Sequence, residues 1–317
     1  MNYHEPVMIK EVIEEMNPQP NENFIDCTLG NAGHTIGILK RTAPDGLPAK
    51  AGAKRLRAGK ILAFELDKKA IEEARQRLQS LSNSGEEDLL SRVEIINDNF
   101  RNIKKYAGKL PKIDGILADL GLRSGQIEES GKGFSFQKDE PLDMRFGGQG
   151  TSASEIVNTY TTDELSDIFR KYGEEKNHRH IAKAIRQARK KKPIKTTGEL
   201  VEIILEFYRR KLHSKKEVPW IGGIHPATRV FQALRIEAND ELGALEQLLK
   251  EGVEILSPEG RIGIISYHSL EDRVVKRFYR TSPHLVAKTK KPIIPGEEEV
   301  QKNRRARSAK LRVATKK

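Results

Sequence analysis

The chain has 317 residues, which is enough for one large domain or two ordinary domains with full hydrophobic cores. Its single cysteine, Cys27, excludes an intrachain disulfide and a cysteine-rich zinc site, so we expect a reduced, cytoplasmic protein without a bound metal. The formal net charge of +12 favours a polyanionic partner, and the lack of a signal-peptide pattern or an apolar run of about 18 residues argues against a membrane.

Strands that alternate with helices are predicted as far as residue 121. The apolar runs predict strands at 23–29, 60–67, 92–98 and 113–121, and helical spacing predicts helices at 7–16, 34–41 and 68–81. The loop 49–60 between them is rich in Ala, Gly and Lys, and no function is assigned to it. This alternation predicts a parallel, doubly wound α/β sheet.

The pattern changes after residue 121. A glycine-rich loop leads into helices predicted at 154–159, 163–172, 177–190 and 197–212, with no convincing strand among them. A long helical region at 225–256 and a strongly apolar strand at 261–269 then return to the sheet, and a last strand is expected at 311–314. We therefore predict a sheet domain at 1–121, an inserted helical domain at 122–219, and a second part of the sheet domain at 220–317 with a basic tail.

Basic residues are concentrated in four stretches, at 50–60, 186–192, 209–216 and 302–317. Clustered Lys and Arg bind phosphates through counterion release, which favours a nucleic-acid partner. The alternative is that these stretches are solvated loops and a frayed terminus.

A doubly wound sheet binds its ligand at the carboxyl ends of its strands. The first turn has Gly30 and Gly33 but lacks the G-x-G-x-x-G pattern that cradles a pyrophosphate, which disfavours NAD. S-adenosylmethionine has no phosphate, and Glu65 after the second strand stands where an acid would accept its ribose hydroxyls. The alternatives are a tight glycine connection and a carboxylate that only caps a helix, a role that suits Asp67.

Seven ordered motifs carry a family resemblance. They are HEPVMIKEV, DCTLGNAGH, DGILADLGLRSGQ, GKGFSFQKDEPLDMR, HPATRVFQALRIEANDELG, ISYHSLEDRVVKRF and RARSAKLRV. Over nearly its whole length the chain closely resembles the ribosomal RNA small subunit methyltransferase H family, which methylates the N4 amine of a cytidine in the decoding centre of bacterial 16S rRNA.

The resemblance implies a Rossmann-like class I S-adenosylmethionine methyltransferase sheet with an inserted all-helical domain that helps to form the RNA cleft. The implied partner is 16S rRNA within the 30S subunit, with no DNA and no membrane, and a homodimer is left open. The cofactor-binding positions that it implies are Ala32, Gly33, His34, Glu65, Phe100, Asp119 and Gln126.

Some residues depart from the family pattern. Asn31 and Ala32 replace part of a glycine run, Glu65 replaces an aspartate, and the sequence 122–125 replaces Val-Ser-Ser-Pro, which places Arg123 in that loop. These changes bear on cofactor affinity, although none removes a needed group. The loop 49–60 is also longer than in the family pattern.

Asp119 is the candidate catalytic residue. Cytidine N4 is a poor nucleophile, and acceptors for its amino hydrogens would favour the pyramidal nitrogen of the transition state. Asp119, together with the carbonyls of Leu120 and Gly121, stands at the end of the fourth predicted strand, where such acceptors are needed. The equally weighted alternative is that Asp119 only binds the cofactor.

Other polar and aromatic residues are candidates for contact with the substrate. Phe134 and Phe136 would stack on an unstacked base, unless they belong to a core. The remaining candidates are Asp143, Arg145, Arg229 and His268. The alternatives are an ion-pair network for Asp143 with Arg145, a structural role for His268, and a helix that starts with Ser269 as its cap.

Two further functional classes compete with RNA methylation. One is a methyltransferase for an amino group in DNA or protein, and the other is a non-catalytic RNA-binding assembly factor that keeps the cofactor pocket as a scaffold. Cofactor turnover distinguishes the second class from an enzyme.

Overall fold

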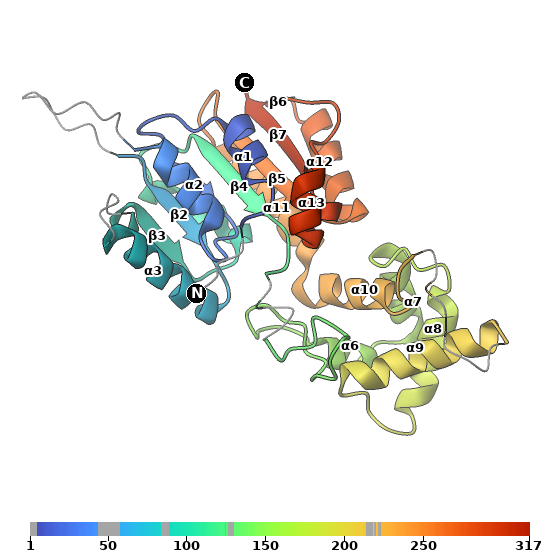
Figure 1. Cartoon of the computed structure of the whole chain (residues 1–317). Helices are drawn as coiled ribbons and strands as arrows, with labels where there is room; N and C mark the ends of the chain where they lie inside the picture. Colours follow the sequence, from blue (N-terminus) through green and yellow to red (C-terminus); the bar gives the residue numbers. More distant parts are fainter. Residues whose placement is uncertain are drawn as a thin grey trace, which may run out of the picture. The chain divides into compact units, whose positions relative to one another are not determined.

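The computed structural model describes residues 5–43, 58–83, 89–123, 125, 130–213, 218, 220 and 223–317. The chain separates into two compact units (Figure 1). The first unit is discontinuous, because it joins Met1–Gly121 to Leu242–Lys317. The second unit, Leu122–Glu241, is the segment between these two parts.

A mixed sheet forms the centre of the first unit. Among the described residues it has seven strands in the order β3-β2-β1-β4-β5-β7-β6. The strands are β1 (Phe24–Asp26), β2 (Ile61–Phe64), β3 (Val93–Ile96), β4 (Gly115–Asp119), β5 (Arg261–Ser266), β6 (Leu285–Ala287) and β7 (Lys310–Lys316). Strands β1 to β5 are parallel, whereas β7 is antiparallel to both of its neighbours. Every residue of β1 and β2 is buried, as expected of parallel strands covered on both faces.

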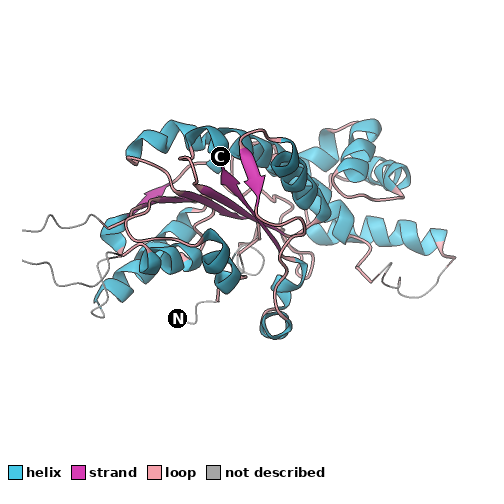
Figure 2. Ribbon diagram, turned by 90° about the horizontal axis from the view of Figure 1, so that it is seen from above, coloured by secondary structure: helices cyan, strands magenta, loops and turns pink. Residues whose placement is uncertain are grey.

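Helices cover both faces of this sheet (Figure 2). One core cluster packs α1 (Ile9–Met16), α2 (Gly33–Arg41) and α3 (Lys68–Asn83) against the sheet. The other cluster packs α4 (Ile103–Tyr106), α11 (Glu241–Ile255) and α12 (Ser269–Thr281) against it. The described residues of this unit also form the short helix α13 (Glu297–Lys302) and the 3-10 turns η1 (Leu90–Arg92), η2 (Phe100–Asn102), η3 (Ala107–Lys109) and η4 (Arg304–Ser308).

The second unit is helical. The helices given by its described residues are α6 (Ala153–Thr159), α7 (Thr162–Lys171), α8 (His178–Arg189), α9 (Thr197–Lys211) and α10 (Thr228–Asn239). Capping boxes start α6, α7 and α9. In each box the side chain of the first residue (Ser152, Thr161 or Thr196) accepts the backbone N–H of a glutamate three residues later, and the carboxylate of that glutamate accepts the backbone N–H of the first residue. A single apolar core holds these helices together.

The predicted fold class is confirmed: the first unit has a Rossmann-like sheet, parallel from β1 to β5, and the helical segment is inserted into it. One predicted boundary needs correction. The sequence ends the helical segment at residue 219, but the compact unit continues to Glu241. The reason is that Val230, Phe231 and Leu234 of α10 are buried in the core of the helical unit.

The basic stretch 302–317 is not a frayed terminus. It contains η4 and then β7, which lies between β5 and β6 in the sheet. Residues 49–57 of the predicted loop 49–60 lie outside the described residues. None of the described helices is both long enough and apolar enough to cross a bilayer.

Candidate active site

The candidate site lies at the carboxyl ends of the parallel strands. Ala32 adopts the left-handed conformation, with φ of 60° and ψ of 21°, as the N-cap of α2. An L-residue other than glycine pays on the order of 1 kcal/mol in this conformation. The family's glycine run thus falls on a turn that needs positive φ, and Gly30 has φ of 50° in the same turn. Neighbouring Gly33 packs against Pro6, with space for no side chain: a Cβ would lie 2.9 Å from its ring.

Glu65 ties this turn to the end of β2. Its Oε1 accepts the backbone N–H groups of Leu66 and Asp67 at 2.8 and 2.9 Å. Its Oε2 accepts the N–H of Gly30 at 3.2 Å. Asp67 accepts the N–H of Lys69 at 2.9 Å at the start of α3, as expected of a helix cap.

Asp119 is the last residue of β4, and its position is fixed from several sides. Its N–H donates to Thr28 Oγ1 at 2.7 Å, and its Oδ1 accepts the N–H of Gly121 at 3.1 Å. The Tyr267 hydroxyl donates to the same carboxylate. Burial raises the pKa of Asp119, an effect that His34, the Gly121 N–H and the Tyr267 hydroxyl oppose.

Tyr267 is a site residue that the sequence analysis missed. It follows β5 directly, and its ring packs on Gly121 so closely that a Cβ there would lie 2.7 Å from the ring. Burial raises the pKa of Tyr267 strongly, and the negative charge of Asp119 adds to the rise. The hydroxyl therefore keeps its proton and serves as a donor to Asp119. The apolar pattern of the strand gives no sign of this role, because the role depends on packing against Gly121, which is far away in the sequence.

His34 lies on the other side of Asp119. Only 6% of the residue is exposed, and its Nε2 lies 2.9 Å from the Val7 carbonyl oxygen. Its Nδ1 lies 4.0 Å from Asp119 Oδ2. The N-terminal segment and the first turn thus hold an imidazole against the candidate catalytic carboxylate.

The remaining predicted cofactor positions are Phe100 and Gln126. Phe100 begins η2, the turn that follows β3 after three residues, and it packs, partly buried, against the core that contains α4. Its turn is held by Asn99, whose side chain accepts the N–H of Arg101 at 3.0 Å. Gln126 lies outside the described residues.

The predicted substrate residues of the second unit mostly have partners in that unit. Phe134 stacks on Phe146 with ring centres 5.4 Å apart. Phe136 stacks on His225 at 4.7 Å and meets Phe231 edge-on at 5.1 Å. Both predicted phenylalanines are only partly buried, and both pack against the helical core.

The two predicted arginines in this unit also have clear partners. Arg145 forms a two-pronged ion pair with Asp143, at 2.6 Å from Nε and 3.1 Å from a terminal nitrogen. This pair lies within the helical unit, and the Asp143 pKa is lowered, because hydrogen bonds from Arg145 outweigh the effect of burial. Arg229 donates to the Glu174 carbonyl at 3.1 Å.

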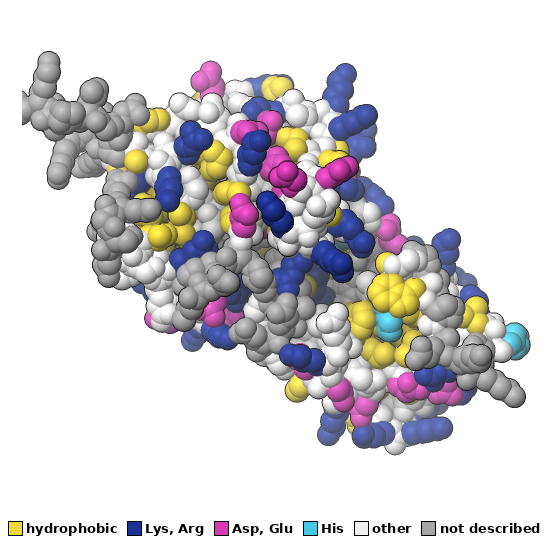
Figure 3. Space-filling view, viewed as in Figure 1, with side chains coloured by type: hydrophobic (Ala, Val, Ile, Leu, Met, Phe, Trp, Pro, Cys, Tyr) yellow, Lys and Arg dark blue, Asp and Glu magenta, His cyan; other side chains and the backbone are white. Residues whose placement is uncertain are grey.

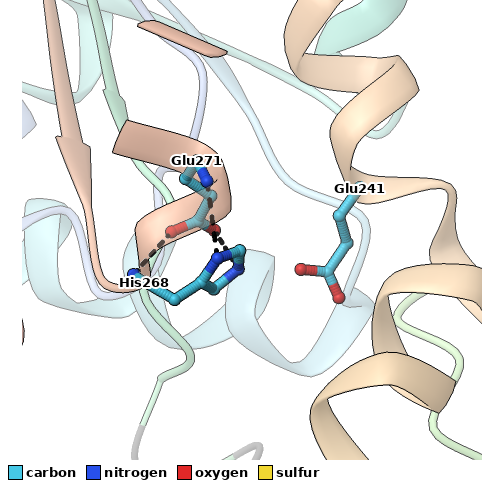
Figure 4. Close-up of side chains that lie close together, drawn as sticks. All are labelled: Glu241, His268 and Glu271. Atoms are coloured by element: carbon cyan, nitrogen blue, oxygen red, sulfur yellow. Dashed lines mark hydrogen bonds and ion pairs between the residues drawn. The ribbon is translucent and has the colours of Figure 1, made fainter. Parts of the chain in front are cut away.

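His268 has a structural partner in the first unit. Its Nδ1 accepts the N–H of Glu271 at 3.4 Å, and Glu271 accepts the N–H of His268 at 3.2 Å (Figure 4). His268 is therefore the N-cap of α12, and the prediction that Ser269 is the cap was wrong by one residue. His268 has the extended backbone of a cap, whereas Ser269 is already in the helix.

Known proteins match this chain along its whole length. A family model described as the MraW methylase family matches residues 1–317. A protein named Ribosomal RNA small subunit methyltransferase H from Clostridioides difficile (strain 630) is 40% identical over an alignment of 338 residues, which covers 99% of this chain and 99% of that protein. A protein of the same name from Desulfotalea psychrophila (strain LSv54 / DSM 12343) is 43% identical over 317 residues, which cover 99% of this chain and 98% of that protein. A solved SAM-dependent O-methyltransferase from Thermotoga maritima has a TM-score of 0.42 at 9% identity, covering 100% of this chain and 68% of that one.

Proposed function

The chain belongs to the MraW methylase family, and from this premise we propose that it methylates the N4 amine of a cytidine in the decoding region of 16S rRNA, within the 30S subunit. It is a methyltransferase that uses S-adenosylmethionine. The observation that carries the choice of substrate is the match over nearly the full length of relatives named as methyltransferases of the small ribosomal subunit RNA.

The residues at the carboxyl ends of the strands suit this cofactor. Bound S-adenosylmethionine supplies an electrophilic methyl group on a cationic sulfur. Glu65 and Asp119 place two carboxylates at the ends of β2 and β4, beside a turn that lacks a pyrophosphate pattern. Three backbone N–H groups fix the Glu65 carboxylate at the end of β2, where an acid would accept the ribose hydroxyls of the cofactor.

Asp119 and the two following carbonyls are the proposed acceptors for the amino hydrogens of cytidine. Tyr267 and the Gly121 N–H hold the Asp119 carboxylate in one orientation before the substrate arrives. A preorganised acceptor is worth more in a buried site than in water, because it needs no reorganisation as positive charge develops on N4. The gain from holding the amine close to the methyl group adds to this effect.

We assign RNA recognition to the helical unit. Figure 3 shows hydrophobic side chains around a histidine on its visible face. Trp220 is 68% exposed and meets His225 edge-on, with ring centres 6.4 Å apart. Burial lowers the pKa of His225, so this ring is neutral near pH 7 and supports the indole as an aromatic neighbour. Trp220 replaces Phe136 as the proposed base-stacking residue, because Phe136 is already stacked on His225.

Trp220→Ala is expected to weaken the binding of single-stranded RNA about 10-fold, because stacking on one aromatic side chain contributes about 1–3 kcal/mol per base. The change should leave the slope of binding against salt intact, since no cation is removed. Trp220 is the single tryptophan of the chain, so RNA should also quench the protein's fluorescence directly. Leu212→Ala, which also removes an exposed apolar side chain, is the control. Unquenched fluorescence at saturating RNA would contradict the assignment.

The proposed reaction is tested with labelled S-adenosylmethionine and two substrates in parallel, unmodified 30S subunits and free 16S rRNA. Nuclease digestion and mass spectrometry of the nucleosides should reveal N4-methylcytidine. The preferred substrate then shows whether methylation follows subunit assembly. Cofactor binding without any methylated nucleoside would favour the scaffold alternative, or an amino group of DNA or protein as the acceptor.

A further inference from the structure

The contacts of the buried His34 ring decide where its proton lies. The Val7 carbonyl oxygen, 2.9 Å from Nε2, can only accept a hydrogen bond. Nε2 must therefore carry a hydrogen. In the neutral ring this leaves Nδ1 with a free lone pair, and Nδ1 is the nitrogen that faces Asp119 Oδ2 at 4.0 Å.

Glu299 and the N-terminal segment fix the Val7 carbonyl that contacts His34. The pKa of Glu299 on α13 is raised by burial, and its Oε1 accepts the Met8 N–H at 2.7 Å, which fixes the backbone next to Val7. His34 and Glu299 interact electrostatically, and Glu5 and Glu11 lie near Glu299. Around Asp119 the ionisable groups are His34, Tyr267 and Asp26. His34 thus lies near two carboxylates, those of Asp119 and Glu299.

We propose that His34 is the final acceptor of the proton that methyl transfer releases, and that the proton reaches it through Asp119. This inference rests on the proposed amine methylation. Methyl transfer would form the nitrogen–methyl bond as the sulfur–methyl bond of the cofactor breaks, with the electron pair left on sulfur. The cationic amine then loses a proton: the N–H bond breaks and an O–H bond forms on Asp119. That O–H bond then breaks as Nδ1 takes the proton, which leaves an imidazolium beside a carboxylate. No electrons are gained or lost.

The geometry allows this transfer with a small adjustment. The 4.0 Å between Nδ1 and Oδ2 is longer than a hydrogen bond, and catalytic hydrogen bonds are often long until substrate is bound. Burial raises the pKa of Asp119, which makes this carboxylate a better proton carrier than an exposed one. His34 does not touch the substrate amine, so it acts through Asp119 as a positioning residue.

His34→Gln tests the relay, because the glutamine amide can still donate to the Val7 carbonyl but cannot take up a proton. We expect its single-turnover rate to fall about 100-fold, the usual scale of acid–base assistance. The rate is measured at saturating S-adenosylmethionine, and the dissociation constant for the cofactor is measured by calorimetry, so that a loss of cofactor binding is separated from a loss of proton transfer. The residual rate should rise with pH and with added small bases. His284→Gln, which changes an exposed histidine, is the control. A wild-type rate and pH profile in His34→Gln would overturn the relay.

A second measurement works without turnover. Nitrogen NMR of ¹⁵N-histidine-labelled protein, with His34→Gln used for assignment, should show the proton of neutral His34 on Nε2 and a bare Nδ1. A proton on Nδ1 would also overturn the proposal. In the wild-type protein the Tyr267 hydrogen bond lowers the Asp119 pKa, so Tyr267→Phe should raise that pKa. The loss of single-turnover activity at low pH should therefore move to higher pH. If the wild-type protein methylates a different amine, the proposed substrate fails while the tautomer result still tests the relay.

Discussion

Asp119→Ala is expected to abolish methyl transfer, with a loss of single-turnover rate of at least about 1000-fold. Removing one preorganised acceptor costs on the order of 100- to 1000-fold in comparable sites, and here the carboxylate also carries the proton to His34. The loss should appear in the rate at saturating S-adenosylmethionine. The measurement is single-turnover methylation of the preferred rRNA substrate, with cofactor affinity determined separately by calorimetry.

Asp119→Asn is the matched variant, because it keeps the shape of the side chain and one acceptor oxygen but cannot carry a proton at neutral pH. A partial rate in Asp119→Asn would separate hydrogen bonding from proton transfer. If saturating cofactor restores the rate of Asp119→Ala, the role of Asp119 is cofactor binding alone. Wild-type activity should fall as pH drops through the raised Asp119 pKa, because the protonated carboxyl no longer accepts from the amine.

Arg312→Ala is expected to lower the free energy of unfolding of the first unit by about 3 kcal/mol, because it leaves a largely buried carboxylate without its main partner. The Arg312 side chain on β7 is 8% exposed, and it holds Asp272 on α12 at 2.7 and 3.3 Å. Lys310, 3.9 Å from Asp272, remains as a weaker partner and limits the loss. Urea unfolding followed by circular dichroism measures the effect.

Arg277→Ala gives the matched control for this prediction. Arg277 lies on α12, the helix of Asp272, and forms an ion pair with Glu246 at 3.0 Å. The Arg277 and Glu246 side chains are 67% and 55% exposed. Exposed pairs contribute only about 0–1 kcal/mol, so this variant should be close to wild type. Equal effects of the two substitutions would show that Arg312 does not stabilise the sheet through its ion pair.

The strands were predictable wherever an apolar run is buried on both faces. The predicted strand at 261–269 contains β5, in which Ile262, Ile264 and Ile265 are buried. Strand β6 was missed because only Leu285 of its three residues is buried, which leaves neither a run nor an alternation to detect. Helix α10 was predicted as helical but placed in the wrong unit, since periodicity does not tell which core a helix joins.

The site was predictable to the extent that it depends on strand ends. The positions of Glu65 and Asp119 after β2 and in β4 follow from the apolar runs that precede them. Tyr267 could not be identified in this way. Its role depends on the packing of its ring against Gly121, and the two residues are far apart in the sequence. The assignment of His268 as a cap depends likewise on backbone angles that no residue pattern reports.

The insertion of the helical unit has a consequence for how this protein can change over evolution. Strands β4 and β5 are hydrogen-bonded neighbours, yet all of Leu122–Glu241 lies between them in sequence. The entropy of closing a loop grows only with the logarithm of its length, so doubling such a long insertion would cost about 0.6 kcal/mol. The helical unit can therefore lengthen or shorten while the sheet persists, which would let the proposed RNA recognition change without a change in the proposed active site.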